Sequence, residues 1–68
     1  MPKLPVVSGA EAIAAFESVG YERARTKGDH VRLKCSGRAS LTVPLHDPVK
    51  RGLIRDAGMS VEEFCEHL

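Results

Sequence analysis

The chain has 68 residues, 28% of them charged, and a formal net charge of +1 at pH 7. A domain of this size buries only about 60% of the surface that its unfolded chain exposes. This excludes an extended catalytic apparatus and a large enclosed cofactor pocket, so we treat residues 1–68 as one domain and expect no cofactor.

The sequence carries no feature of a membrane or secreted protein. No apolar run is long enough to span a bilayer, and Met1–Pro5 leads into ordinary domain sequence rather than a signal peptide. We therefore expect no membrane partner. Cys35 and Cys65 fall at apolar positions of their patterns, which favours free buried thiols and a cytoplasmic protein. The cysteines do not form short paired spacings with His46 or His67, so we expect no metal site.

Cations are concentrated in the middle of the chain. Nine Lys and Arg residues and three acidic residues lie between Tyr21 and Arg55, a net charge of +6, whereas four carboxylates and no cation follow from Asp56 onward. A basic segment can bind a polyanion through one surface. Dispersed, solvated charge is the commoner explanation for a generic domain.

The first predicted helix runs from Gly9 to Val19. Ser8 and Glu11 form a capping box, in which the hydroxyl accepts from the Glu11 amide and the glutamate reaches back to the Ser8 amide. Gly20 supplies a left-handed stop. The apolar stripe of this helix comprises Ala12, Ile13, Phe16 and Val19.

Two strands are predicted next, joined by the glycine turn Lys27-Gly28-Asp29. The first, Tyr21–Thr26, alternates poorly and would place Tyr21, Arg23 and Arg25 on one face. The second, His30–Cys35, alternates clearly: Val31, Leu33 and Cys35 point to the core, and His30, Arg32 and Lys34 share the solvated face.

A third strand follows the hairpin connection Ser36-Gly37-Arg38. Its apolar positions, Leu41, Val43 and Leu45, alternate with Thr42. Pro44 lacks an amide donor, which places it at a sheet edge or a strand terminus.

Two helices complete the chain. Asp47 and Pro48 predict a helix over Pro48–Ala57, with Val49, Leu53, Ile54 and Ala57 on its apolar side and Gly58 at its end. Ser60 and Glu63 form a second capping box, which opens a short helix. Its apolar stripe comprises Val61, Phe64, Cys65 and Leu68.

The predicted element order is α-β-β-β-α-α, which indicates a two-layer α+β fold with helices on one face of an antiparallel sheet. The other face stays open and carries His30 beside cations. This pattern allows a ribonuclease, in which the 2′-hydroxyl of RNA is the nucleophile and a histidine transfers the proton. It also allows a nucleic-acid-binding module without chemistry, or a protein-interaction domain whose charged face is incidental, and spacing alone does not separate the three. His46 is the rival histidine, expected to pack or cap the following turn, and His67 is expected to be solvated.

A set of short motifs in a fixed order resembles the HicA family, the mRNA-cleaving toxins of bacterial HicAB toxin–antitoxin pairs. The matching segments are Val7-Ser8-Gly9, Gly20-Tyr21, Lys27-Gly28-Asp29-His30, Leu41-Thr42-Val43-Pro44-Leu45-His46, Arg55-Asp56-Ala57-Gly58-Met59 and Glu62-Glu63-Phe64. Each motif is weak alone, but together they cover nearly the whole chain.

The resemblance implies an α-β-β-β-α fold like the double-stranded-RNA-binding domain, and a metal-independent endoribonuclease acting on mRNA. It places the catalytic histidine at His30 and implies a HicB antitoxin as the neutralising partner. On this basis we expect His30 to transfer the proton. The expected RNA phosphate contacts are Arg25, Lys27, Arg32 and Lys34.

The chain departs from the family pattern at two places. Asp29 stands where the family usually has serine; a carboxylate there bears on whether the histidine acts as acid or base, and it repels phosphate. The segment from Lys50 to Gly58 is about one helical turn shorter than in the family. Either the loop after His46 has joined the helix, as Asp47-Pro48 suggests, or the helix begins later and is very short.

Overall fold

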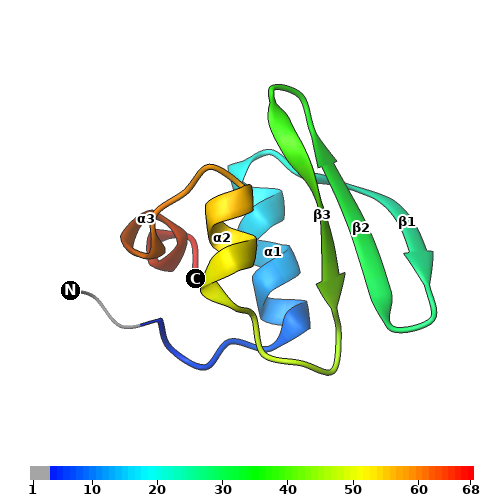
Figure 1. The fold of residues 1–68 in the computed structure, drawn as a ribbon, viewed down its shortest axis with the longest axis horizontal. Helices are drawn as coiled ribbons and strands as arrows, with labels where there is room; N and C mark the ends of the chain where they lie inside the picture. The colour runs from blue at the N-terminus through cyan, green and yellow to red at the C-terminus, as the bar shows by residue number, and fades with distance from the viewer. Residues whose placement is uncertain (1–3) are drawn as a thin grey trace.

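The computed structural model describes residues 4–68, and the first three residues of the N-terminal lead-in lie outside this range. The elements are helix α1 (Gly9–Val19), strands β1 (Glu22–Lys27), β2 (His30–Cys35) and β3 (Arg38–Pro44), and helices α2 (Arg51–Asp56) and α3 (Val61–Glu66). The strands form an antiparallel sheet in the order β1-β2-β3. Helices α1 and α2 lie beside the sheet, and α3 lies on their far side (Figure 1). The predicted α+β fold, with its α-β-β-β-α order and short C-terminal helix, is confirmed.

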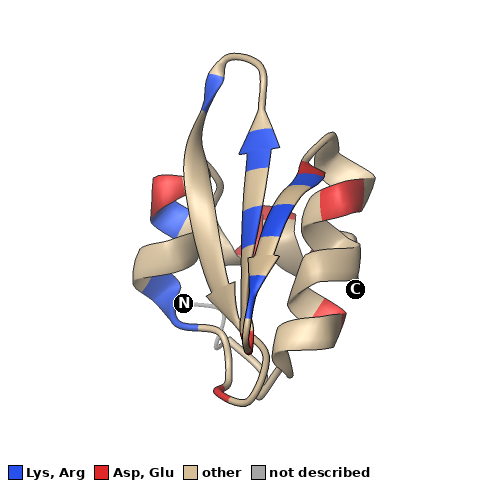
Figure 2. Cartoon of the chain, turned by 90° about the vertical axis from the view of Figure 1, so that its right-hand side faces the viewer, with Lys and Arg blue, Asp and Glu red and all other residues tan. Residues whose placement is uncertain are grey.

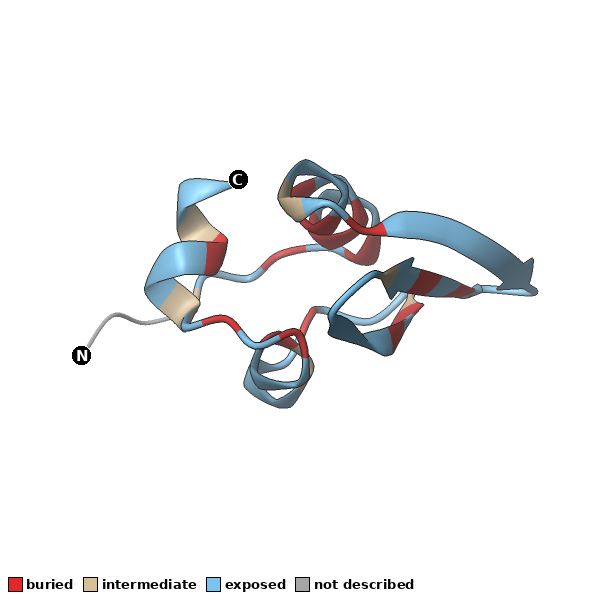
Figure 3. Cartoon of the chain, turned by 90° about the horizontal axis from the view of Figure 1, so that it is seen from above, coloured by how far each residue is buried: buried red, intermediate tan, exposed pale blue. Residues whose placement is uncertain are grey.

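The hydrophobic core lies between the sheet and the helices (Figure 3). The alternation predicted for β2 is confirmed, because Val31 and Leu33 are buried and His30, Arg32 and Lys34 are exposed. Cys35 is only half-buried, and both cysteines are free. The largest fully buried side chains are Phe16, Phe64, Ile13, Leu33, Leu41, Ile54, Val31 and Val43.

Helix α1 has the predicted limits and both predicted caps. The Ser8 hydroxyl accepts from the Glu11 amide at 3.2 Å, while the Glu11 carboxylate accepts from the Ser8 hydroxyl at 3.0 Å instead of from the predicted amide. Gly20 ends the helix with φ 127°. At the other end, Gly9 packs so tightly on the end of β3 that a Cβ there would lie 2.7 Å from the Leu45 Cα. This close approach fixes the start of α1 against the sheet.

A bulge in β1 overturns the prediction that Arg23 and Arg25 share a face. Arg23 lies opposite Leu33, whereas Arg25 lies opposite Arg32, so Ala24 is an extra residue in the ladder. Arg23 therefore points toward the helices, where its guanidinium lies 3.6 Å from the Glu17 carboxylate of α1. Arg25 points to the open face.

Strand β1 also begins one residue later than predicted, because Tyr21 belongs to the core. Its ring packs edge-on against Phe16 with centroids 5.7 Å apart, and its hydroxyl donates to the Ala39 carbonyl at 2.8 Å. Every residue of β1 itself is exposed. In the part of the chain that the structure describes, no helix covers this edge strand (Figure 3), which accounts for its polar sequence.

The predicted helix over Pro48–Ala57 is wrong at its start, since α2 begins at Arg51. The preceding segment is extended instead. The Val49 amide donates to the Val7 carbonyl at 3.0 Å, the Val49 side chain is 6% exposed, and Lys50 has φ −109° and ψ 154°. The chain thus buries Val49 and bonds its amide to Val7 instead of starting a helix with Asp47 as the N-cap and Pro48 as the first residue. Of the two possibilities for this segment, the late and very short helix is therefore the correct one.

The serine half of the second capping box is confirmed, because the Ser60 hydroxyl accepts from the Glu63 amide at 3.1 Å. The Glu63 carboxylate accepts from the Ser60 hydroxyl at 3.4 Å instead of from the predicted amide. Phe64 of α3 is buried against Phe16, with ring centroids 5.1 Å apart. Leu68 was placed on the same apolar stripe, but it follows the end of the helix and is 53% exposed. The longest helix in the described range has 11 residues, and none of these helices could cross a membrane.

Candidate nucleic-acid interface

The open face of the sheet carries a concentration of positive charge. Lys and Arg residues recur along β1 and β2, while acidic residues are seen mainly on the helices (Figure 2). The residues that sequence reasoning selected are all exposed here: Arg25, Lys27, His30, Arg32 and Lys34.

Strand register arranges the central residues of this face in two adjacent rows. One row joins Arg25, Arg32 and Thr42, and the next joins Lys27, His30 and Pro44. Directly opposed residues of an antiparallel sheet project from the same face. The register thus gathers residues from three strands around His30.

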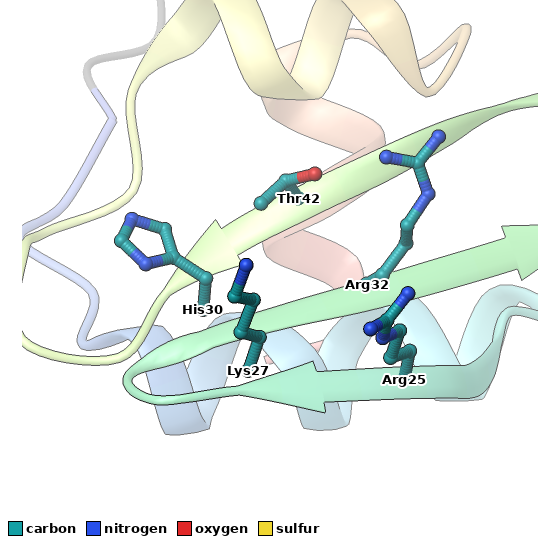
Figure 4. Close-up of a pocket in the computed structure, with 5 residues that line it drawn as sticks. All are labelled: Arg25, Lys27, His30, Arg32 and Thr42. Atoms are coloured by element: carbon teal, nitrogen blue, oxygen red, sulfur yellow. The ribbon is translucent and has the colours of Figure 1, made fainter.

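Five of these side chains line a shallow depression of about 240 Å³ and project from one face of the sheet (Figure 4). Four are expected site residues: Arg25, Lys27, His30 and Arg32. The fifth, Thr42, was missed as a site residue. Its position between the buried Leu41 and Val43 was the available signal, because it directs the hydroxyl toward the face that His30 occupies.

Lys34 is exposed on the same face but does not line the depression. It lies opposite Glu22, a residue of opposite charge. Of the expected phosphate contacts, it is the one that the fold keeps apart from His30.

The hairpin turn between β1 and β2 fixes the position of His30. Gly28 has φ 60° at the first of two loop positions, as in type II′ hairpin turns, and Lys27 pairs with His30 to close the turn. The Leu45 amide donates to the Asp29 carbonyl at 2.7 Å, which ties the turn to the end of β3. The backbone at His30 is therefore held by β1 through the pairing with Lys27 and by the end of β3 through the Leu45 bond.

The Asp29 carboxylate lies beside the imidazole, with Oδ1 3.1 Å from the Nδ1 atom of His30. The two side chains are 48% and 58% exposed, respectively. Solvent screens a contact of this kind, so its contribution to folding stability is small.

The lysine and arginine side chains of the depression have no such acidic neighbour in the described range. Among residues 4–68, no acidic side chain lies within salt-bridge distance of Arg25, Lys27 or Arg32. Like charges placed directly opposite each other, as Arg25 and Arg32 are, destabilise a sheet. An anion bound in the depression would relieve this repulsion.

The two remaining histidines lie outside the depression. His46 was expected to pack or cap the turn after β3, but its side chain is exposed. His67 is exposed, as expected, and its Nδ1 atom lies 3.0 Å from the Ser18 hydroxyl. Across residues 4–68 there is no group of three or more His, Cys, Asp or Glu side chains placed to hold a metal ion.

One of three comparisons with known proteins gives a match. Searches of curated proteins and of solved structures gave no significant match. Residues 9–59 match the family described as "HicA toxin of bacterial toxin-antitoxin", a span that contains the whole sheet, α1, α2 and the depression around His30. The chain therefore belongs to the HicA toxin family of bacterial toxin–antitoxin systems.

Proposed function

We propose that this chain is an mRNA interferase, a toxin-type endoribonuclease that cleaves RNA without a metal and is neutralised by a HicB-like antitoxin. One observation carries the proposal: a single histidine lies on an open sheet face among three cations that have no acidic partner within residues 4–68, in a member of a toxin family. Each of these groups has a role in cleavage of a phosphodiester.

His30 is the proposed proton-transfer residue. RNA supplies its own nucleophile in the 2′-hydroxyl. As that oxygen attacks the adjacent phosphorus, its proton passes to the imidazole, and the bond from phosphorus to the 5′-oxygen breaks. The products are a 2′,3′-cyclic phosphate and a free 5′-hydroxyl, whose proton comes from the imidazolium or from water.

The cations bind and stabilise the phosphate. Arg25, Lys27 and Arg32 lie around His30, where they can neutralise the extra negative charge of the pentacovalent transition state. Lys34 lies beyond the depression, so we assign it to a neighbouring phosphate along the RNA chain. The depression is shallow and open, which suits an extended polymer better than a small molecule enclosed in a pocket.

A binding module without catalysis is the second candidate. Its support is the exposure of His30, since an open histidine on a sheet is compatible with binding alone. The proposed chemistry, unlike binding, requires a 2′-hydroxyl in the substrate.

The experiment compares two oligonucleotides of the same sequence, one RNA and one with every 2′-hydroxyl methylated, in buffer with EDTA. We expect both to bind, because both present the same phosphates. Only the RNA should be cut, and its new 3′ ends should carry a cyclic phosphate. If both bind and neither is cut, the binding module replaces the ribonuclease. If cleavage occurs only when Mg²⁺ replaces EDTA, the metal-independent mechanism is wrong.

A further inference from the structure

We propose that Asp29 is a positioning residue, which holds the proton of neutral His30 on Nδ1 and leaves Nε2 as the proton acceptor. The placement of the proton is a property of the folded chain. Its consequence for cleavage rests on the proposed function.

The contact between these consecutive residues depends on the hairpin. Neighbouring residues within a strand point to opposite faces, so they do not touch. Asp29 instead occupies the last loop position and His30 the first strand position. The turn is closed by the pairing of Lys27 with His30 and by the bond from the Leu45 amide to the Asp29 carbonyl. These constraints fix the backbone of both residues, and in this arrangement the carboxylate lies on the Nδ1 side of the ring.

The chemistry of the two groups determines where the proton lies. Neutral imidazole has one N–H and one nitrogen lone pair, while an ionised carboxylate can only accept. At 3.1 Å, a lone pair on Nδ1 would face the Asp29 oxygen and be repelled, whereas an N–H is attracted to it. A carboxylate near one ring nitrogen thereby selects the tautomer. Nε2 then carries the lone pair that can take a proton from a 2′-hydroxyl.

The same carboxylate works against substrate binding, because it stands beside a site for phosphate. Lys27, directly across the ladder from His30, supplies an opposing positive charge. Removal of the Asp29 charge should therefore leave RNA affinity unchanged or raise it. A lower cleavage rate together with undiminished affinity would separate a positioning role from damage to the fold.

The test uses Asp29→Asn, which keeps the side-chain size and the preference for turns. The control is Asp47→Asn, which removes the same charge from an exposed loop residue that does not line the depression. The first readout is the ¹⁵N NMR spectrum of the His30 ring at a pH where the imidazole is neutral, assigned by comparison with His30→Ala. The second is single-turnover RNA cleavage, measured beside RNA binding.

For the wild type and Asp47→Asn, we expect the spectrum of a protonated Nδ1. Asp29→Asn should shift the population toward a protonated Nε2 and reduce the cleavage rate by roughly 10- to 100-fold, without weaker RNA binding. This is less than the ~10⁴-fold loss for a buried triad aspartate, because water reaches this half-exposed pair. An unchanged His30 spectrum in Asp29→Asn would overturn the proposal, as would an unchanged rate in a variant that retains His30-dependent cleavage. If the wild type does not cut RNA, the proposed function fails, and the NMR comparison alone decides where Asp29 places the proton.

Discussion

Arg25 and Arg32 lie directly opposite each other across β1 and β2, and no acidic side chain in the described range lies within salt-bridge distance of either. The bulge at Ala24 creates this relationship, because it turns Arg25 to the open face while Arg23 pairs with Glu17 on the other. The fold therefore maintains a repulsive pair beside His30. Relief of that repulsion by phosphate is the physical basis for RNA binding in our account.

Arg32→Gln should stabilise the free protein and weaken its binding to RNA. Loss of the like-charge pair should raise the free energy of unfolding by about 0.2–0.5 kcal/mol at low salt. This gain in stability should vanish in 1 M salt, because the Debye length is then only about 3 Å and the repulsion between the two charges is screened. Urea denaturation at both salt concentrations measures it, and RNA titrations should show a salt dependence reduced by about one phosphate contact.

Arg23→Gln is the matched control, since it removes a cation from the same strand but on the opposite face. It breaks the contact with Glu17, so it should not stabilise the protein. If both substitutions gave the same gain, general net charge and not the opposed pair would be responsible.

Two glycine substitutions should have opposite effects on stability. In Gly52→Ala the new methyl group meets no atom within 4 Å, so the variant should gain about 0.4–1 kcal/mol, because alanine reduces the conformational freedom of the unfolded chain. In Gly9→Ala the methyl group would collide with the Pro44 carbonyl oxygen and with the backbone of Leu45. Overpacking of this kind costs about 1–3 kcal/mol. Thermal or urea unfolding of the two variants measures both effects, and a stable Gly9→Ala protein would contradict the close approach of α1 to β3.

The buried tyrosine predicts a loss of stability at high pH. Burial raises the pKa of Tyr21 above its ordinary value of 10.0; Cys35 raises it further, and Arg38 acts in the opposite direction. Tyr21 ionises at a lower pH in the unfolded chain than in the folded protein. Its contribution to the free energy of unfolding is therefore complete below pH 10 and is lost as the pH rises through the folded pKa. Tyr21→Phe should be less stable near neutral pH by about 1 kcal/mol, since it lacks the hydrogen bond to Ala39. The difference from the wild type should narrow above pH 10 in urea denaturation, and a constant difference would contradict a raised pKa.

If a HicB-like antitoxin neutralises the chain, we expect it to cover the cationic face or block His30. Steering by opposite charges makes the affinity of such a complex fall with salt. Arg32→Gln should weaken the complex more than Arg51→Gln, which removes a cation from α2. Calorimetry of the complex with the protein encoded next to this chain tests the expectation. A complex insensitive to salt and to Arg32→Gln would indicate inhibition through another surface.

Much of the fold follows from local sequence patterns. The capping residues Ser8 and Ser60, together with Gly20, predicted two helix starts and one helix end, because these signals act over three or four residues. The alternation in β2 predicted its buried and exposed faces, because that strand packs on the core from one side only. These features required no knowledge of tertiary contacts.

The features that the sequence did not predict depend on contacts between distant segments. The late start of α2 depends on the bond between Val49 and Val7, and the burial of Tyr21 depends on Phe16 and Ala39. The two faces of β1 depend on a bulge that its irregular sequence does not specify. Local alternation already placed Thr42 on the open face, but only the strand register brings it opposite Arg32 and into the depression.

The central claim is that His30 transfers the proton while the surrounding cations bind the RNA. Its most direct test is single-turnover cleavage by the wild type and His30→Ala in EDTA, with RNA binding measured in parallel. His46→Ala is the control, because His46 is exposed and lies outside the depression. We expect His30→Ala to bind RNA as the wild type does and to cut it roughly 10²–10⁴ times more slowly, and His46→Ala to match the wild type in both. Equal cleavage by the wild type and His30→Ala would contradict the claim.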